Sequence, residues 1–287
     1  MKRRILITAV TLAILAVYSQ LFSTPAVNWQ TDWQQTLKVA IEKKQPVFID
    51  FYTDWCPHCK RLDEITFSND KVSEYFTKEN YALLKINPEK DTEAENKFKV
   101  YSYPTLIVFK SDGTELDRML GFKDPDELIK NLEDLKKGTG TLDDLLGKYK
   151  KYPAADKSGE KIAFMFAILD KYIARADYPQ ALELIDQVIA LDKDNAQKQA
   201  SAAMYQRGYI YYKWKKYDQA VAALLEINKV YPQSEDAEGG YASAAYYSEK
   251  IKDPKLTLEI LKGFVKNFPN SKYVERFNKR IAELEKQ

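Results

Sequence analysis

The sequence places both of its cysteines and its single histidine in one tetrapeptide, Cys56-Pro57-His58-Cys59. An apolar run over residues 46–52 leads into it, and the valine, isoleucine and aromatic residues of that run favour a buried strand. Pro57 favours the start of a helix, because the first helical position needs no backbone donor. The pattern therefore predicts a strand, a turn and a helix that carries two cysteines near its beginning. Cysteines three positions apart on one helix face can close a disulfide.

This position predicts different chemistry for the two sulfur atoms. The free N–H groups and the dipole of a helix N-terminus favour the thiolate of Cys56. A protonated His58 would add positive charge beside that thiolate. Cysteines in such surroundings have pKa values of about 3.5–7.5, below their ordinary value of about 8.5. We therefore expect Cys56 to be an exposed attacking thiolate, and Cys59, covered by the chain, to resolve the mixed disulfide.

Three other roles fit the cysteine pair less well. A structural disulfide at this spacing would close a very short loop and would constrain the unfolded chain little. A zinc site needs four ligands, and the sequence has no second cluster of cysteine or histidine. Two inert buried thiols are a third alternative. We therefore predict redox chemistry at Cys56 and Cys59, with no metal and no cofactor beyond the cysteines.

The motif and its surroundings resemble the active site of the thioredoxin superfamily. The similarity covers the strand, the acidic residue within it and the Trp-Cys-x-x-Cys-Lys segment over residues 55–60. It continues through Ser102-Tyr-Pro-Thr105 and the apolar residues that follow, then through a hairpin at residues 111–114 and a final strand and helix from Gly121. The resemblance implies a thioredoxin-like fold with the active site at the cysteine pair.

Two finer resemblances point in opposite redox directions. The segments 52–56 and 66–70 look most like the C-terminal thioredoxin-like domain of DsbD-type reductases. The dipeptide Pro57-His58 is instead that of DsbA-type oxidases. The sequence therefore leaves the direction of electron flow open.

The resemblance also assigns roles to four residues outside the cysteine pair. A carboxylate such as Asp50, within an apolar strand, is desolvated and its pKa is raised. In the family the matching acid helps to shuttle the proton of the second cysteine, so the resemblance gives Asp50 that role against Cys59; the alternative is that strand alternation turns Asp50 to solvent. The resemblance also implies a cis Tyr103–Pro104 bond facing the first cysteine. We accordingly expect Trp55, Tyr103 and Pro104 to bind the substrate chain.

Strand and helix patterns alternate through residues 27–137, which predicts an α/β domain around a mixed sheet. The expected fold class is an α/β thioredoxin-like domain, with a central mixed sheet flanked by helices, followed by an all-α tetratricopeptide-like helical-repeat domain. Residues 138–158 contain glycine, proline and polar residues, and we expect them to form a linker with some helix.

Residues 159–287 are predicted to be helical and repetitive. Tyr172, Tyr211 and Tyr247 recur at intervals close to the roughly 34-residue period of tetratricopeptide repeats, and the region resembles that family. Leu256 departs from the family pattern, which has alanine there. Such repeats form a short solenoid with a concave interaction surface, so we expect this domain to dock protein partners. Its many tyrosines suit an interface, and the alternative is that most of them pack helix on helix.

Residues 1–26 have the layout of an export signal. Three basic residues at positions 2–4 precede an apolar stretch that reaches Val17, and small residues follow up to Ala26. The stretch is shorter than the roughly 20 apolar residues of a comfortable membrane span. We predict a cleaved signal peptide or an uncleaved signal anchor, with a buried helix of a cytosolic protein as a further alternative. The first two predict a chain that is periplasmic or anchored on the extracytoplasmic side of a membrane.

Composition narrows the choice of partners. The 44 lysine and arginine residues nearly balance the 42 aspartate and glutamate residues, which gives no support for nucleic-acid binding. We predict an extracytoplasmic thiol–disulfide oxidoreductase that exchanges disulfides with protein thiols, uses a membrane-bound or soluble redox partner and docks proteins through its repeats. The alternative is a non-catalytic binding or assembly factor, in which the repeats bind the client and the thioredoxin-like domain is a scaffold. The intact cysteine pair argues against that alternative.

Overall fold

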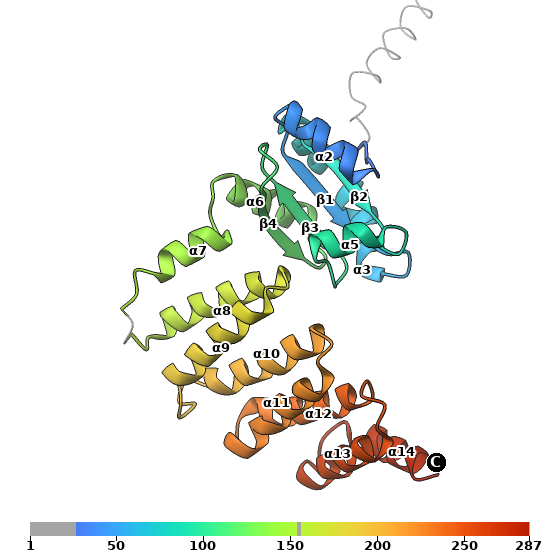
Figure 1. Cartoon of the computed structure of the whole chain (residues 1–287), viewed down its shortest axis with the longest axis vertical. Coiled ribbons are helices and arrows are strands. Elements are labelled where there is room, and N and C mark those ends of the chain that lie inside the picture. The colour runs from blue at the N-terminus through green and yellow to red at the C-terminus, as the bar shows by residue number, and fades with distance from the viewer. Residues whose placement is uncertain (1–26, 154–155, 287) are drawn as a thin grey trace, which may run out of the picture. The chain divides into compact units, whose positions relative to one another are not determined.

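The chain divides into two compact units, with the boundary between Thr141 and Leu142. The computed structural model describes residues 27–153 and 156–286, so the predicted export segment 1–26 lies outside the described residues. The first unit contains a four-stranded sheet with helices, and the second contains helices alone (Figure 1). This arrangement confirms the predicted fold class of an α/β unit followed by a helical region.

The first unit is built on a mixed sheet with the strand order β2-β1-β3-β4. Strand β1 runs parallel to β2 and antiparallel to β3, and β3 runs antiparallel to β4. The strands are β1 (Val47–Phe51), β2 (Ala82–Ile86), β3 (Thr105–Phe109) and β4 (Glu115–Leu120). The helices are α2 (Trp33–Glu42), α3 (Pro57–Arg61), the π-helix η1 (Leu62–Phe67), α4 (Asp70–Lys78), α5 (Thr92–Phe98) and α6 (Pro125–Lys136).

The side chains of β1 alternate between two apolar cores. Phe48 lies in a core with residues of η1, α4 and α6, whereas Val47, Ile49 and Phe51 lie in a core with residues of α2 and α5. Successive strand residues point to opposite faces of a sheet, so Asp50 shares the face of Phe48. All five positions of β1 are buried. The central strand therefore directs Asp50 into the layer that contains η1, the continuation of the cysteine-bearing helix.

The segment before β1 contains helix α2, which begins at Trp33. Asp32 stops the helix from extending further back, because its side chain accepts a backbone N–H of the first turn at 2.9 Å. Ahead of this cap, Gln30 forms a parallel β-bridge with Leu84 in β2. The residues before α2 thus pair with the edge strand of the sheet.

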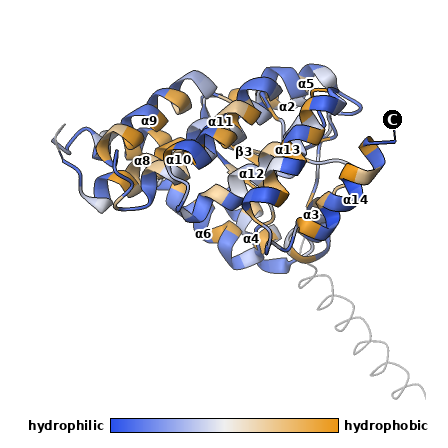
Figure 2. Ribbon diagram, turned by 90° about the horizontal axis from the view of Figure 1, so that it is seen from below, coloured by the Kyte–Doolittle hydropathy of each residue, from blue (hydrophilic) through white to orange (hydrophobic). Residues whose placement is uncertain are grey.

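The second unit is a succession of helices in which neighbours along the chain pack against each other. Figure 2 shows that these helices carry both hydrophobic and hydrophilic residues, as amphipathic helices do. No helix among the described residues is long and apolar enough to cross a membrane. The helices are α7 (Leu142–Tyr149), α8 (Gly159–Ala174), α9 (Tyr178–Leu191), α10 (Gln199–Lys213), α11 (Tyr217–Val230), α12 (Glu235–Ser248), α13 (Pro254–Asn267) and α14 (Val274–Leu284).

Helix α7 lies within the segment 138–158, which we expected to form a linker with some helix. Its apolar residues Leu142, Leu145 and Tyr149 pack against the core formed by α8 and α9. This part of the segment therefore belongs to the helical unit rather than to a free connection.

Helices α10 and α11 approach closely at Gly208. A Cβ atom at Gly208 would lie 2.4 Å from Cγ of Leu224, and Leu224 is fully buried. Ala244 in α12 is also fully buried. Small side chains at these positions allow neighbouring helices to pack at short distance.

Replacing Gly208 by alanine should therefore destabilise the helical unit. The added methyl group must displace a buried leucine, and such overpacking costs about 1–3 kcal/mol. Urea unfolding followed by circular dichroism measures the change. Gly147→Ala in α7 is the matched control, because a Cβ there meets no atom within 4 Å. We expect that variant to be up to about 1 kcal/mol more stable, since alanine favours helix over glycine. Equal effects of the two variants would contradict the close approach.

Candidate functional site

Cys56 and Cys59 form a disulfide at the point where the chain leaves β1 and enters α3, and their Cα atoms are 5.3 Å apart. Cys56 caps the helix with an extended backbone, and Pro57 takes the first helical position. Sγ of Cys56 accepts the backbone N–H of Cys59 at 3.2 Å. A negative charge on this sulfur would be stabilised by that donor and by the helix end. The local sequence signals therefore predicted this geometry correctly.

Exposure does not distinguish the two cysteines. Cys56 is 3% exposed and Cys59 is 2% exposed. The expectation of an exposed Cys56 is thus wrong for the disulfide-bonded chain, because the bond turns both sulfur atoms toward each other under the surrounding chain. What separates the two residues is the backbone N–H donated to Sγ of Cys56.

Two aromatic side chains next to the disulfide are held by glutamates. Trp55 is 64% exposed, and its indole N–H donates to Glu89 at 2.8 Å. The Trp55 ring meets Tyr103 edge-on, with ring centroids 6.2 Å apart. The hydroxyl of Tyr103 donates to Glu95 at 3.2 Å. Burial, and after it the charge of Glu95, raises the pKa of Tyr103 above its usual range, so this hydroxyl stays protonated and remains a donor.

The remaining predicted site residues lie on two different segments. The predicted cis bond joins Tyr103 to Pro104. Pro104 is buried beside the start of β3, and its carbonyl accepts the N–H of Gly121 at 2.9 Å. His58 is exposed in the first turn of α3. The structure thus brings Trp55 and Tyr103 into contact, while His58 extends toward solvent from the helix that carries both cysteines.

Asp50 is fully buried in the middle of β1. The alternative in which strand alternation turns it to solvent is therefore wrong. Neither oxygen of Asp50 has a hydrogen-bond partner within the described parts of the chain, and Nζ of Lys85 lies 3.6 Å from Oδ2. Burial raises the pKa of Asp50 from an ordinary value of 3.8 to about 7, and the positive charge of Lys85 partly offsets that rise. Asp50 can therefore gain and lose a proton near neutral pH.

Lys85 is a site residue that the sequence analysis missed. The register of the parallel pair places it directly beside Asp50 on the neighbouring strand. It also forms an ion pair with Asp63 of η1. The sequence does contain a signal for this residue, because strand 82–86 is apolar except for one lysine. A buried ammonium requires a partner, so a lysine in such a strand indicates an acidic neighbour. Aromatic rings surround the ammonium, with centroids 5.0–5.6 Å away: Trp29, Tyr52 and Phe67.

Metal ligands do not gather around the cysteine pair. Across residues 27–153 and 156–286, no group of three histidine, cysteine, aspartate or glutamate side chains is arranged to hold a metal ion.

A strand that ends in a helix-capping cysteine, a buried acid and a cis-proline loop define a thioredoxin-like domain. The family model for the thioredoxin-like domain matches residues 33–136, and the chain belongs to this family. Thioredoxin from Chlamydia muridarum is 37% identical over 84 residues, which are 29% of this chain and 76% of that protein.

Two further similarities concern thiol–disulfide proteins. The thiol:disulfide interchange protein DsbD from Campylobacter jejuni is 34% identical over 93 residues, 31% of this chain. The chain spans only 16% of that relative's length. A solved structure described as a DsbH oxidoreductase superposes with a TM-score of 0.35 at 17% identity, over 38% of this chain and 84% of that one.

The raised pKa of Asp50 makes a prediction about stability. A carboxyl with a higher pKa in the folded than in the unfolded chain keeps its proton more tightly when folded, so folding stability is lost as the pH rises from about 4 through 7. Asp50→Asn removes this loss. Three pKa units correspond to about 4 kcal/mol, so the oxidised variant should be more stable than the original chain by up to that amount near pH 8 and by little near pH 3.

Urea unfolding of both chains across this pH range measures the difference. Asp54→Asn is the matched control, because it removes the same charge at a position whose side chain is 63% exposed and pairs with Lys90 only at the surface. A pH dependence that is the same for Asp50→Asn and for the original chain would contradict the buried acid's raised pKa.

Proposed function

We propose that the chain is an extracytoplasmic thiol–disulfide oxidoreductase that exchanges disulfides with protein substrates through Cys56 and Cys59. One observation carries the proposal: the two cysteines form a disulfide at the start of α3, and a backbone N–H donates to Sγ of Cys56. The similarity to a protein named for thiol:disulfide interchange supports the same class of reaction.

In the reducing direction, the Cys56 thiolate attacks one sulfur of a substrate disulfide. A bond forms between Cys56 and that sulfur, and the second substrate sulfur leaves as a thiolate that takes a proton from water. The Cys59 thiolate then attacks Sγ of Cys56, which closes the Cys56–Cys59 disulfide and releases the first substrate sulfur as a thiolate. Two electrons pass to the substrate, and the reverse sequence oxidises a substrate dithiol.

Asp50 is proposed to accept the proton of the Cys59 thiol before the second step. A base is most effective when its pKa lies near the working pH, and burial raises the pKa of Asp50 to about 7. Its oxygens make no hydrogen bond within the described residues, which leaves them able to accept one. Lys85, 3.6 Å away, limits how far the pKa rises.

The substrate chain is proposed to lie against Trp55, Tyr103 and Pro104. The exposed face of Trp55 offers an apolar contact, and its bond to Glu89 fixes the ring in position. The bond from Tyr103 to Glu95 fixes the second ring in the same way. A positioned pair of rings costs little side-chain entropy when a peptide binds.

The regions outside the α/β unit complete the proposal. Residues 1–26 have the composition of an export signal and are proposed to take the chain out of the cytoplasm. The helical unit, expected from the sequence to span residues 159–287, is proposed to dock the protein partner and so to raise its effective concentration at the disulfide.

The assignment of attacking and resolving cysteines is tested by trapping. Cys59→Ala leaves a nucleophile without its resolving thiol, so mixed disulfides with substrate proteins should accumulate on Cys56. Non-reducing electrophoresis followed by mass spectrometry of the adducts measures them. Cys56→Ala is the matched control and should trap little. Equal trapping by both variants would refute the roles, and no adduct from either would favour a non-catalytic binding protein.

The reduction potential tests the role of His58. A positively charged imidazole near Cys56 favours its thiolate and hence the reduced form, whereas the buried Asp50 opposes a second negative charge when ionised. We expect a potential between the thioredoxin and DsbA values of about −270 and −120 mV. His58→Gly should lower it, as measured by equilibration with glutathione. Lys60→Gln is the control for loss of a nearby exposed charge. An unchanged potential in His58→Gly would exclude this role.

A further inference from the structure

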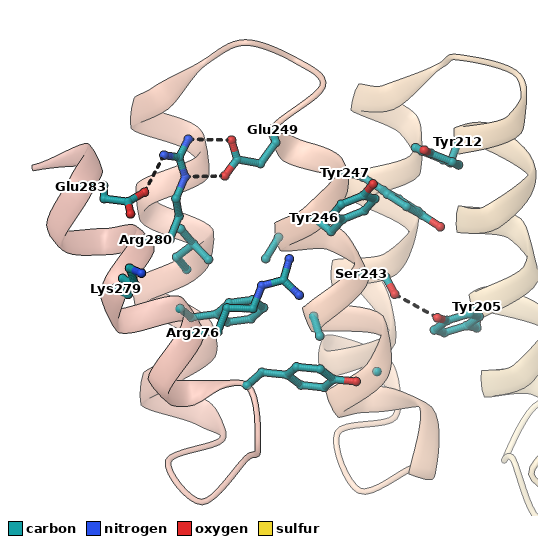
Figure 3. A pocket seen from close by; sticks show the side chains of 16 residues that line it. Tyr205, Tyr212, Ser243, Tyr246, Tyr247, Glu249, Arg276, Lys279, Arg280 and Glu283 are labelled. Atoms are coloured by element: carbon teal, nitrogen blue, oxygen red, sulfur yellow. Dashed lines mark hydrogen bonds and ion pairs between the residues drawn. The ribbon is translucent and has the colours of Figure 1, made fainter. Parts of the chain in front are cut away.

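A hollow of about 760 Å³ lies within the helical unit, away from the cysteine pair in sequence. It is lined by residues of α10, α12, α13 and α14 (Figure 3). Its size falls within the range of about 300–1,000 Å³ that is usual for ligand sites. We refer to it as the α10–α14 hollow. Its charges and aromatic side chains define what it can bind.

Both acidic side chains of the hollow are already paired. The guanidinium of Arg280 forms two hydrogen bonds with Glu249, at 2.8 and 2.9 Å, and a third with Glu283 at 3.1 Å. Figure 3 shows the contacts with Glu249 joining the end of α12 to α14, whereas Glu283 lies in α14 itself. A planar guanidinium that binds one carboxylate through both oxygens holds it in a fixed geometry. Glu249 therefore links two helices, and Glu283 pairs with Arg280 within α14.

Two cations of the same wall have no such partner. Arg276 and Lys279 line the hollow from α14, and neither side chain has an ion pair or hydrogen bond within the described parts of the chain. Arg276 extends from α14 toward α12 in Figure 3. Since Arg280 already occupies both acids, the hollow has an excess of positive charge. An anionic ligand would be electrostatically complementary to it.

The opposite wall presents tyrosine rings. Tyr212 and Tyr247 stack with centroids 4.0 Å apart and an interplanar angle of 11°. Tyr205 is held by a 2.9 Å hydrogen bond to Ser243. Tyr246 is 51% exposed and adds a free aromatic face. Rings fixed in this way supply apolar contact area and hydroxyl groups at low entropic cost.

We propose that the α10–α14 hollow binds an acidic peptide segment of a partner protein, with carboxylates on Arg276 and Lys279 and apolar side chains on the tyrosine wall. The lining comes from four helices, and Arg276, Lys279 and Tyr246 are all exposed, so the hollow is open to solvent. A small anion is usually held in an enclosed pocket. This hollow is open and has cations on one wall and aromatic rings on the other, so it suits an extended peptide chain better. The inference rests on the docking role proposed above for the helical unit and is independent of the thiol chemistry.

The test uses the full chain in its oxidised form and a short fluorescent peptide that alternates glutamate with leucine. Fluorescence anisotropy should show saturable binding, which weakens in about 0.5 M salt because the contacts are exposed and screened. The counterpart peptide with glutamine in place of glutamate should bind far more weakly. The double variant Arg276→Gln, Lys279→Gln should weaken binding by roughly fivefold to thirtyfold, as two partly exposed ion pairs allow.

A matched variant controls for overall charge. Lys255→Gln with Lys266→Gln removes the same charge from α13, at two positions that do not line the hollow, and should leave binding unchanged. Tyr246→Ala should also weaken binding. The proposal is overturned if the acidic peptide does not bind, if the glutamine peptide binds equally well, if the α13 variant loses as much affinity, or if free glutamate at equal carboxylate concentration displaces the peptide. Peptide binding without any trapped adduct on Cys59→Ala would refute the thiol chemistry alone.

Discussion

The burial of strand β1 is the constraint on which the candidate site depends. The strand pairs with β2 on one edge and β3 on the other, and apolar cores cover both of its faces. Its end fixes where the chain turns into α3, and hence where Cys56 caps the helix. Because no position of the strand reaches water, a carboxyl within it is desolvated. The same strand therefore positions the disulfide and raises the proton affinity of Asp50.

Sequence reasoning succeeded where the cause is local. Valine, isoleucine and aromatic residues made β1 recognisable, and Pro57 after Cys56 marked the start of a helix. It failed where the cause is the meeting of distant segments. Burial of Cys56 and the contact of Asp50 with Lys85 depend on strand register and on covering residues, neither of which local patterns contain. The cis bond before Pro104 was predicted from the family resemblance and not from the local residues.

The helical unit shows the same division between local and distant causes. Local patterns marked this region of the sequence as helical and repetitive, and the structure contains a succession of helices there. The pairing of Arg280 with Glu249 was not visible in the sequence, because 31 positions separate the two residues. That pairing decides which charges of the α10–α14 hollow remain available. A count of acidic and basic residues therefore says little about the charge that a ligand would meet.

Lys85 forms ion pairs with the buried Asp50 and with a carboxylate that is partly exposed at the surface. Its ammonium lies between Asp50, which is 1% exposed, and Asp63, which is 44% exposed. Burial raises the pKa of Asp50 most, and the charge of Asp63 adds to that rise. The rings of Trp29, Tyr52 and Phe67 lie 5.0–5.6 Å from the ammonium. Salt ions can screen Asp63 but cannot reach Asp50. The ionic strength of the medium therefore influences the pKa of Asp50, although Asp50 itself is buried. It does so through its effect on the charge of Asp63.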